Sequence, residues 1–280
     1  MDNYLEINRA NWDSRVEHHL SGYDLDKFRS DPAFLSHVVQ FDKERLGSIE
    51  GLDIVHLQCH IGTDTLSLAR LGAKSITGVD FSPNALSAAR DLASELGIEA
   101  TFVESTVDDA VSALGNKKYD MVYTGIGALC WLPDIKNWAK VVSSLLHPGG
   151  RLFIREGHPV LWALSYERPD GLLSLEYNYF ESEGLSSVEE KSYVDHEGAV
   201  SSPESISFNH GLGEIITALI NEGMTITAFE EHDSVPYRAL GEAMEDIGQG
   251  EFRLRENPER LPVSYTLQAR KKLDNSITIE

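Results

Sequence analysis

The junction between a short apolar run and a helical pattern carries the first residues suited to chemistry. It reads Leu57-Gln58-Cys59-His60-Ile61-Gly62-Thr63. A dinucleotide-binding loop needs three glycines at such a junction, because its backbone must press against a pyrophosphate at the helix N-terminus. Only Gly62 is in place, and the side chains of Gln58 and His60 would hold a pyrophosphate off. The loop is therefore predicted to bind a ligand that has no pyrophosphate.

A carboxylate ends the next apolar run. Asp80 lies 22 residues after Gln58, at the position where an acidic side chain accepts hydrogen bonds from both hydroxyls of a ribose. Its alternative role is to cap the following helix. Ser82 already stands at that cap position, with Pro83 at the first helical position, which leaves the carboxylate available. A nucleoside without a pyrophosphate fits both observations.

The elements that must position these residues alternate from residue 50 onward. Apolar runs at residues 52–57, 75–79, 100–103, 119–124 and 151–154 predict strands, and helical patterns follow the first, second and fourth of them. Such alternation indicates right-handed βαβ units in a parallel sheet that helices cover on both faces. Because such sheets bind ligands beyond the carboxyl ends of their strands, we expect the site there.

The alternation changes after residue 160, and a helix rich in Trp, Tyr and His is expected before the sheet. The elements expected in these outer parts are a helix at residues 4–23, antiparallel strands at 172–180 and 188–195, a helix at 212–220, strands at 225–229 and 263–269, and a short helix with loops at 237–261.

Five strings together carry a resemblance to a known family. They are residues 55–67, Gly78-Val79-Asp80-Phe81-Ser82, Glu104-Ser105-Thr106-Val107, Tyr119-Asp120-Met121-Val122 leading into Gly125, and residues 146–152. Over about residues 4–270 the chain resembles a class I S-adenosylmethionine-dependent methyltransferase, of the branch whose first motif reads LQCHxGxDTLSxARLGA.

The resemblance implies a fold and a division of the chain. The implied α/β fold is a doubly wound, Rossmann-like sheet of seven mostly parallel strands, the last antiparallel, with an antiparallel β insertion after strand 5. The implied segments are a helical flap at residues 1–45, the S-adenosylmethionine-binding core at 46–160, a β insertion or lid at 161–208, the completion of that core at 209–270 and a tail at 271–280.

The resemblance also implies S-adenosylmethionine as methyl donor, S-adenosylhomocysteine as product, and no metal. Thr106 stands where the family commonly has an acid that meets the adenine, so a backbone contact from Val107 is the expected substitute. The implied cofactor contacts are Gln58, His60, Gly62, Asp80, Phe81, Thr106, Val107 and Gly125. Candidates for the acceptor pocket are Trp12, His18, Tyr23, Trp131, His158 and Tyr166. Core packing is the alternative role of each candidate, and no catalytic base is assigned.

Charge and composition restrict the partners. The chain has 45 Asp and Glu against 24 Lys and Arg, a net charge of −21, which disfavours nucleic acid and anionic membranes as partners. Two cysteines cannot form a disulfide scaffold or a four-thiolate zinc site. With no apolar run of about 18 residues and no signal-like start, we expect a cytoplasmic enzyme with a small-molecule acceptor; the sequence does not indicate its oligomeric state.

Other enzyme classes find little support. The chain has no Gly-x-Ser-x-Gly elbow, phosphate-binding loop or His-Glu-x-x-His helix. His18 and His19 adjoin, so on a helix they point about 100° apart and cannot hold one metal. Two alternatives stay open. One is a non-catalytic S-adenosylmethionine-binding protein. The other is a nicotinamide-dependent oxidoreductase, which agrees with Asp80 but not with the absence of two glycines from the first loop.

Overall fold

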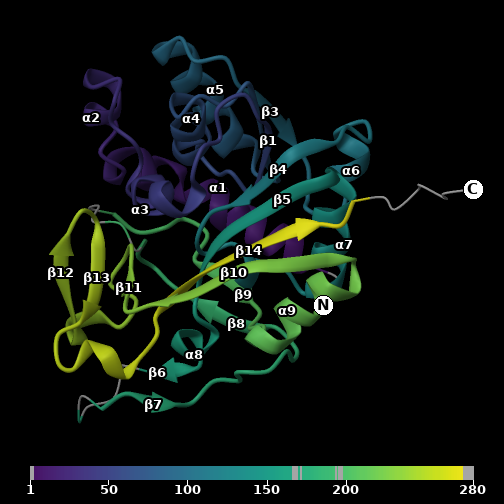
Figure 1. Cartoon of the computed structure of the whole chain (residues 1–280). Helices are drawn as coiled ribbons and strands as arrows, with labels where there is room; N and C mark the ends of the chain where they lie inside the picture. The colour runs from purple at the N-terminus through teal and green to yellow at the C-terminus, as the bar shows by residue number, and fades with distance from the viewer. Residues whose placement is uncertain (1–2, 166–169, 171, 193, 195–197, 274–280) are drawn as a thin grey trace, which may run out of the picture.

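A seven-stranded sheet with helices on both faces forms the centre of the chain (Figure 1). The computed structural model describes residues 3–165, 170, 172–192, 194 and 198–273. The strand order is β10-β14-β5-β4-β1-β2-β3. Neighbouring strands from β3 to β5 pair in parallel, whereas β14 pairs antiparallel with both β5 and β10. The predicted mostly parallel, doubly wound sheet is therefore confirmed.

The elements of this central layer follow the predicted alternation closely. The strands are β1 (Asp53–Leu57), β2 (Ser75–Asp80), β3 (Thr101–Glu104), β4 (Tyr119–Thr124), β5 (Leu146–Gly157), β10 (Met224–His232) and β14 (Ser264–Lys271). The helices are α1 (Tyr4–Gly22), α2 (Leu25–Ser30), α3 (His37–Leu46), α4 (Thr63–Arg70), α5 (Pro83–Leu96), α6 (Ala110–Ala113), α7 (Ile135–Leu145), α8 (Pro159–Trp162) and α9 (Leu212–Asn221).

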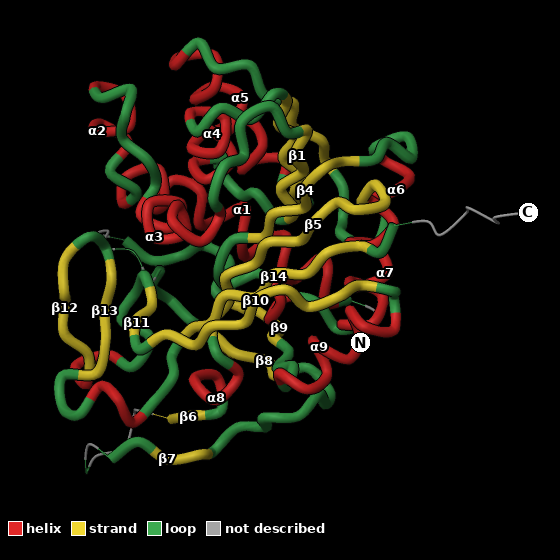
Figure 2. Tube along the Cα trace, viewed as in Figure 1, coloured by secondary structure: helices red, strands yellow, loops and turns green. Residues whose placement is uncertain are grey.

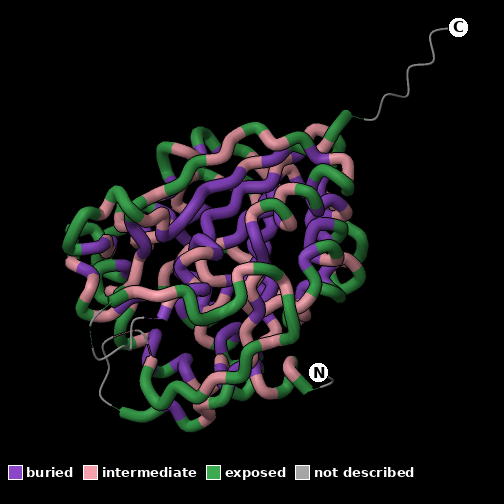
Figure 3. Tube along the Cα trace, turned by 90° about the horizontal axis from the view of Figure 1, so that it is seen from below, coloured by how far each residue is buried: buried purple, intermediate pink, exposed green. Residues whose placement is uncertain are grey.

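Two apolar layers hold the helices to the sheet, and buried segments gather in the interior of the chain (Figure 3). Successive strand residues point to opposite faces, so Val122 packs in the layer that contains Trp138 of α7, while Met121 packs in the layer that contains Leu46 of α3. Trp138 is fully buried. Among the described residues, no helix has the length and apolar character needed to cross a membrane.

The stretch at residues 237–261 corrects a prediction. Instead of a short helix with loops, it contributes to a three-stranded antiparallel sheet of β11 (Ser234–Val235), β12 (Met244–Gly248) and β13 (Glu251–Leu254), with only single 3₁₀ turns beside it. The turn between β12 and β13 has positive φ at Gln249 (58°) and Gly250 (76°), as a tight hairpin requires. This small sheet lies beyond the carboxyl end of β5 (Figure 2).

The predicted antiparallel β insertion is confirmed, but its strands are shorter than expected and lie at other residues. β7 (Ser174–Leu175) pairs with β6 (Leu164–Ser165), and β8 (Leu185–Val188) pairs with β9 (Glu204–Ser207). The expected strand at 188–195 lies partly outside the described residues. β9 is tied to α1, because the Asn8 side-chain amide both donates to the Ile206 carbonyl (2.9 Å) and accepts from the Ile206 N–H (2.8 Å).

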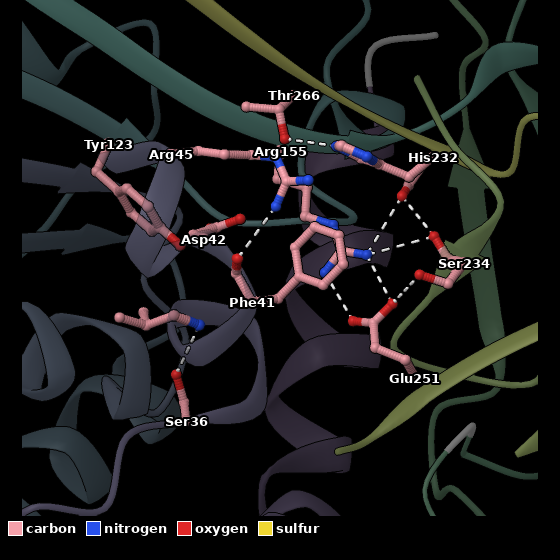
Figure 4. Close-up of polar contacts among 12 residues, drawn as sticks. Ser36, Phe41, Asp42, Arg45, Tyr123, Arg155, His232, Ser234, Glu251 and Thr266 are labelled. Atoms are coloured by element: carbon pink, nitrogen blue, oxygen red, sulfur yellow. Dashed lines mark hydrogen bonds and ion pairs between the residues drawn. The ribbon is translucent and has the colours of Figure 1, made fainter. Parts of the chain in front are cut away.

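A buried ion pair fastens the small sheet to the central one (Figure 4). Arg155 of β5 donates to both carboxylate oxygens of Glu251 of β13, each at 2.8 Å. Ser234 donates to the same carboxylate at 2.7 Å. The Arg155 guanidinium also lies 3.5 Å from the ring centre of Phe41 on α3. The pair joins three elements that are far apart in the sequence.

Glu251→Gln should lower the free energy of unfolding by about 3–5 kcal/mol, because it leaves the Arg155 charge buried without its counter-ion. The matched control is Glu245→Gln, whose partner Arg253 is partly exposed; its cost should stay below about 1 kcal/mol. Urea denaturation measures both variants. Equal costs for the two would contradict this role of the buried pair.

Candidate active site

The loop after β1 keeps a backbone that normally requires glycine. Gln58, His60 and Gly62 all have positive φ, at 57°, 48° and 78°. This left-handed region is unfavourable for residues with a Cβ. The loop therefore has the backbone path of a glycine-rich loop, but two of its positions add a side chain to the site.

Asp80 at the end of β2 holds this loop. Its carboxylate accepts the His60 N–H at 2.8 Å and the Ser82 N–H at 2.9 Å. Ser82 caps α5 as predicted, with its hydroxyl accepting the Ala85 N–H. Asp80 is thus engaged with the backbone rather than unpartnered, although each carboxylate oxygen keeps a further lone pair. Burial raises the pKa of Asp80 to about 6.

Helix α1 covers the loop with aromatic rings. His19 stacks on Tyr23, with ring centres 5.1 Å apart, and its Nδ1 lies 2.5 Å from Nε2 of His60. Trp12 meets the rings of both His60 (5.0 Å) and Trp131 (5.5 Å) edge-on. The structure thus brings together Trp12, Tyr23 and Trp131 from the predicted acceptor candidates. His19 of the same helix contacts His60 edge-on as well, with ring centres 4.7 Å apart.

Burial keeps the two contacting histidines neutral. Desolvation, with a smaller contribution from His60, lowers the pKa of His19 to about 2. Desolvation lowers the pKa of His60 to about 3. One ring therefore donates and the other accepts the hydrogen between them, as neutral imidazoles can. The wall that they form is uncharged at neutral pH.

A second carboxylate lies against Gly125, just after β4. A Cβ built on Gly125 would lie 3.0 Å from Oδ2 of Asp64 and 3.7 Å from Nε2 of His56. Burial raises the pKa of Asp64 to about 6 and lowers that of His56 to about 3. Asp64 was not among the predicted site residues; its position two residues after Gly62, in the first turn of α4, was the available signal.

The loop after β4 depends on Glu156. This buried carboxylate accepts the backbone N–H groups of Gly127 (2.7 Å), Ala128 (2.8 Å), Leu129 (2.8 Å) and Gly157 (2.6 Å). Gln58 then joins the two loops, because its Nε2 donates to the Ala128 carbonyl at 2.9 Å. Within the part of the chain that the structure describes, the buried Oε1 of Gln58 has no hydrogen-bond partner.

The remaining predicted residues lie near the carboxyl ends of the strands or contact other parts of the chain. Thr106 exchanges hydrogen bonds with Asp109 in the turn after β3, Val107 is buried, and Phe81 lies under Arg9. His18 is buried on α1. Both ring nitrogens of His158 are engaged, one with Glu231 (3.0 Å) and one with the Val160 N–H. Tyr166 lies outside the described residues. The binding roles of all these residues stay predictions.

Comparison with known proteins gives sequence relatives over the centre of the chain. Residues 55–152 match the family model of the methyltransferase domain. The chain is 32% identical over 111 residues to the ubiquinone biosynthesis O-methyltransferase of Aeromonas salmonicida (strain A449), covering 40% of this chain and 45% of that protein. It is 33% identical over 125 residues to the Photorhabdus laumondii protein of the same name, covering 45% and 49%. The chain thus spans about half the length of these relatives.

Solved structures are similar over most of the chain. A putative S-adenosylmethionine-dependent methyltransferase from Listeria monocytogenes has a TM-score of 0.61 at 19% identity, covering 84% of this chain and 98% of its own. One from Mesorhizobium loti has a TM-score of 0.57 at 21% identity, with the same coverage. A glycopeptide N-methyltransferase complexed with S-adenosylmethionine has a TM-score of 0.53 at 14% identity, covering 83% and 92%.

The fold is that of the class I S-adenosylmethionine-dependent methyltransferases. Residues 55–152, which match the methyltransferase-domain model, run from β1 into β5 of this fold. The resemblance drawn from the five strings is confirmed at the level of the fold and of this domain.

The imidazole rings of His19 and His60 should stay neutral between pH 5 and pH 8, because burial holds their pKa at about 2 and about 3. Ring-nitrogen chemical shifts in NMR spectra measure this. In the urea-unfolded chain, the same rings should titrate near about 6.5. A titration midpoint near 6 for either ring in the folded protein would contradict the buried pair.

Proposed function

We propose that this protein transfers a methyl group from S-adenosylmethionine to a small-molecule acceptor. The observation that carries the proposal is the first loop, which keeps three left-handed residues beside the buried Asp80 although two of its glycines are missing. This backbone, at the carboxyl end of β1, is where class I sheets take a nucleoside ligand. The fold and the matching domain support the same conclusion.

Three features of the described residues fit this cofactor. The Asp80 carboxylate retains lone pairs that can accept hydrogen bonds from ribose hydroxyls. Gly125 leaves open the space beside the Asp64 carboxylate that a Cβ would occupy, and a carboxylate there suits an ammonium group such as that of a methionine moiety. The Oε1 of Gln58 offers a buried acceptor without a hydrogen-bond partner among the described residues.

For methyl transfer, the chain mainly has to position the acceptor against the methyl group and to exclude water from the site. S-adenosylmethionine supplies a methyl group on a positively charged sulfonium, already activated for in-line displacement. Trp12, Trp131 and the neutral His60 form an aromatic wall, which keeps water from the reacting groups. A side-chain base is needed only for an acceptor that keeps its proton until attack, and we assign none.

The contacts between helix α1 and the β insertion favour a small acceptor. Besides Asn8, Asn11 of α1 donates to the Ser202 carbonyl at 2.8 Å, and His19 contacts the Ser192 hydroxyl at 3.0 Å. The flap and the insertion are thus joined above the first loop, and we propose that they close together over the cofactor and exclude polymers. The net charge of −21 also disfavours nucleic acid.

The names of the relatives agree with a small acceptor. The curated relatives are named as O-methyltransferases of ubiquinone biosynthesis, and one structural neighbour as a glycopeptide N-methyltransferase. These names support acceptors far smaller than a nucleic acid, and they leave both oxygen and nitrogen as the methylated atom. We propose the cytoplasm as the location, in keeping with the two cysteines being free thiols.

Asp80→Ala should weaken S-adenosylhomocysteine binding by roughly 2–3 kcal/mol, because it removes charge-assisted hydrogen bonds to the ribose. Calorimetry measures this, with circular dichroism to verify folding. The matched control is Asp91→Ala, an exposed carboxylate on α5, which should leave the affinity unchanged. Unchanged affinity in Asp80→Ala, or tighter binding of NAD than of S-adenosylhomocysteine by the unmodified protein, would overturn the assignment.

Methyl transfer to a small molecule is tested with radiolabelled S-adenosylmethionine and a cell extract. We expect label in the fraction that passes a small-pore filter, because the flap and insertion exclude polymers from the site. The control is the Asp80→Ala variant, which should label little. Label confined to RNA or to a protein band would contradict the small-molecule acceptor, and binding without any transfer would favour the non-catalytic alternative.

A further inference from the structure

Three side chains capable of holding a metal ion meet where the insertion reaches α9. Glu181 comes from the segment between β7 and β8, His210 from the segment after β9, and Glu214 from the first turn of α9. One ligand atom from each lies within 4.8 Å of the other two. The cluster contains one imidazole nitrogen and two carboxylates, so it is not an acidic patch alone.

The hydrogen bond of His210 fixes which nitrogen faces the cluster. Its Nε2 lies 2.6 Å from the Leu132 carbonyl oxygen, which can only accept, so Nε2 carries the hydrogen. In the neutral ring, Nδ1 then holds a lone pair. His210 is 3% exposed, and its Nδ1 has no hydrogen-bond partner in the described ranges. A metal-binding histidine commonly donates its other N–H to a carbonyl in this way.

A carboxylate oxygen, itself an acceptor, lies near this lone pair. Oε1 of Glu181 lies 3.7 Å from Nδ1 of His210, beyond the range of about 2.7–3.2 Å for a hydrogen bond. Two acceptors facing each other repel unless a positive charge lies between them. Ligands bound to one ion at about 2.0–2.2 Å lie roughly 3–3.5 Å from each other, so this pair needs only a small contraction to share an ion.

The third ligand is already held in place. Glu214 Oε2 accepts the N–H of Gly211 at 2.8 Å and that of Glu181 at 3.4 Å. The carboxylate keeps further lone pairs that an ion can use. Both Glu214 and His210 are therefore oriented by the backbone before any ion arrives, which lowers the entropy cost of binding.

We propose that Glu181, His210 and Glu214 bind one divalent transition-metal ion of the Zn²⁺ class. A set of one nitrogen and two carboxylate oxygens suits Zn²⁺, Co²⁺ or Mn²⁺, whereas Mg²⁺ and Ca²⁺ prefer oxygen ligands alone. The ion ties the insertion to α9 and, through Leu132, to the loop after β4. The ion would act as a structural clip.

The test uses Co²⁺ and Zn²⁺ alone as probes, on full-length protein stripped with EDTA and dialysed. We expect one Co²⁺ per chain by calorimetry, with a visible absorption band of a low-coordinate site. Glu181→Gln should weaken binding at least about tenfold, and His210→Gln should do the same. Because His210→Gln also loses the bond to Leu132, Glu181→Gln is the variant that decides. Zn²⁺ should raise the unfolding temperature of the unmodified protein and not that of Glu181→Gln.

The control is Glu183→Gln, which removes an equal charge from an exposed position two residues away. It should bind Co²⁺ within about twofold of the unmodified protein. Absence of saturable binding would overturn the proposal and favour a proton between His210 and Glu181. Equal weakening in Glu181→Gln and Glu183→Gln would show nonspecific binding to surface acids and overturn it as well.

Discussion

The hydrogen bond from the His60 N–H to the Asp80 carboxylate is the contact on which the site depends. It holds a loop in which two residues with side chains adopt left-handed backbone, at a cost of about 1–3 kcal/mol each. The side chains of Gln58 and His60 then have definite positions: one reaches the loop after β4, and the other meets α1. A glycine-rich loop would provide neither contact. Here the first loop therefore also holds the loop after β4 and helix α1 in place above it.

The end of β5 organises the other half of the site, because adjacent residues on a strand point to opposite faces. Arg155 points toward α3 and binds Glu251 of the small sheet, while Glu156 points to the opposite face and binds the loop after β4. The same strand end therefore fixes both the accessory sheet and the loop that carries Gly125. Burial of both charges is tolerated because each has several hydrogen-bond partners.

The central sheet could be predicted from the sequence because parallel strands buried on both faces are continuous apolar runs. The expected position of the candidate site, beyond the carboxyl ends of these strands, was also drawn from that topology. Glu156 and His19 could not be given their contacts, since their partners are set by tertiary structure; Glu156 binds residues 27 to 29 positions earlier. The hairpin at β12 and β13 was missed, although Gly248-Gln249-Gly250 is a turn signal, because its strands are short and polar.

The most direct test of the account is a crystal structure with S-adenosylhomocysteine bound. We expect the ribose hydroxyls to lie within hydrogen-bond distance of Asp80 while the His60 N–H still donates to the same carboxylate. We also expect the amino group to face Asp64 and Gly125, and the sulfur to face the aromatic wall of Trp12 and Trp131. A ligand bound elsewhere on the sheet, or a first loop that has lost its left-handed residues at Gln58 and His60, would contradict it.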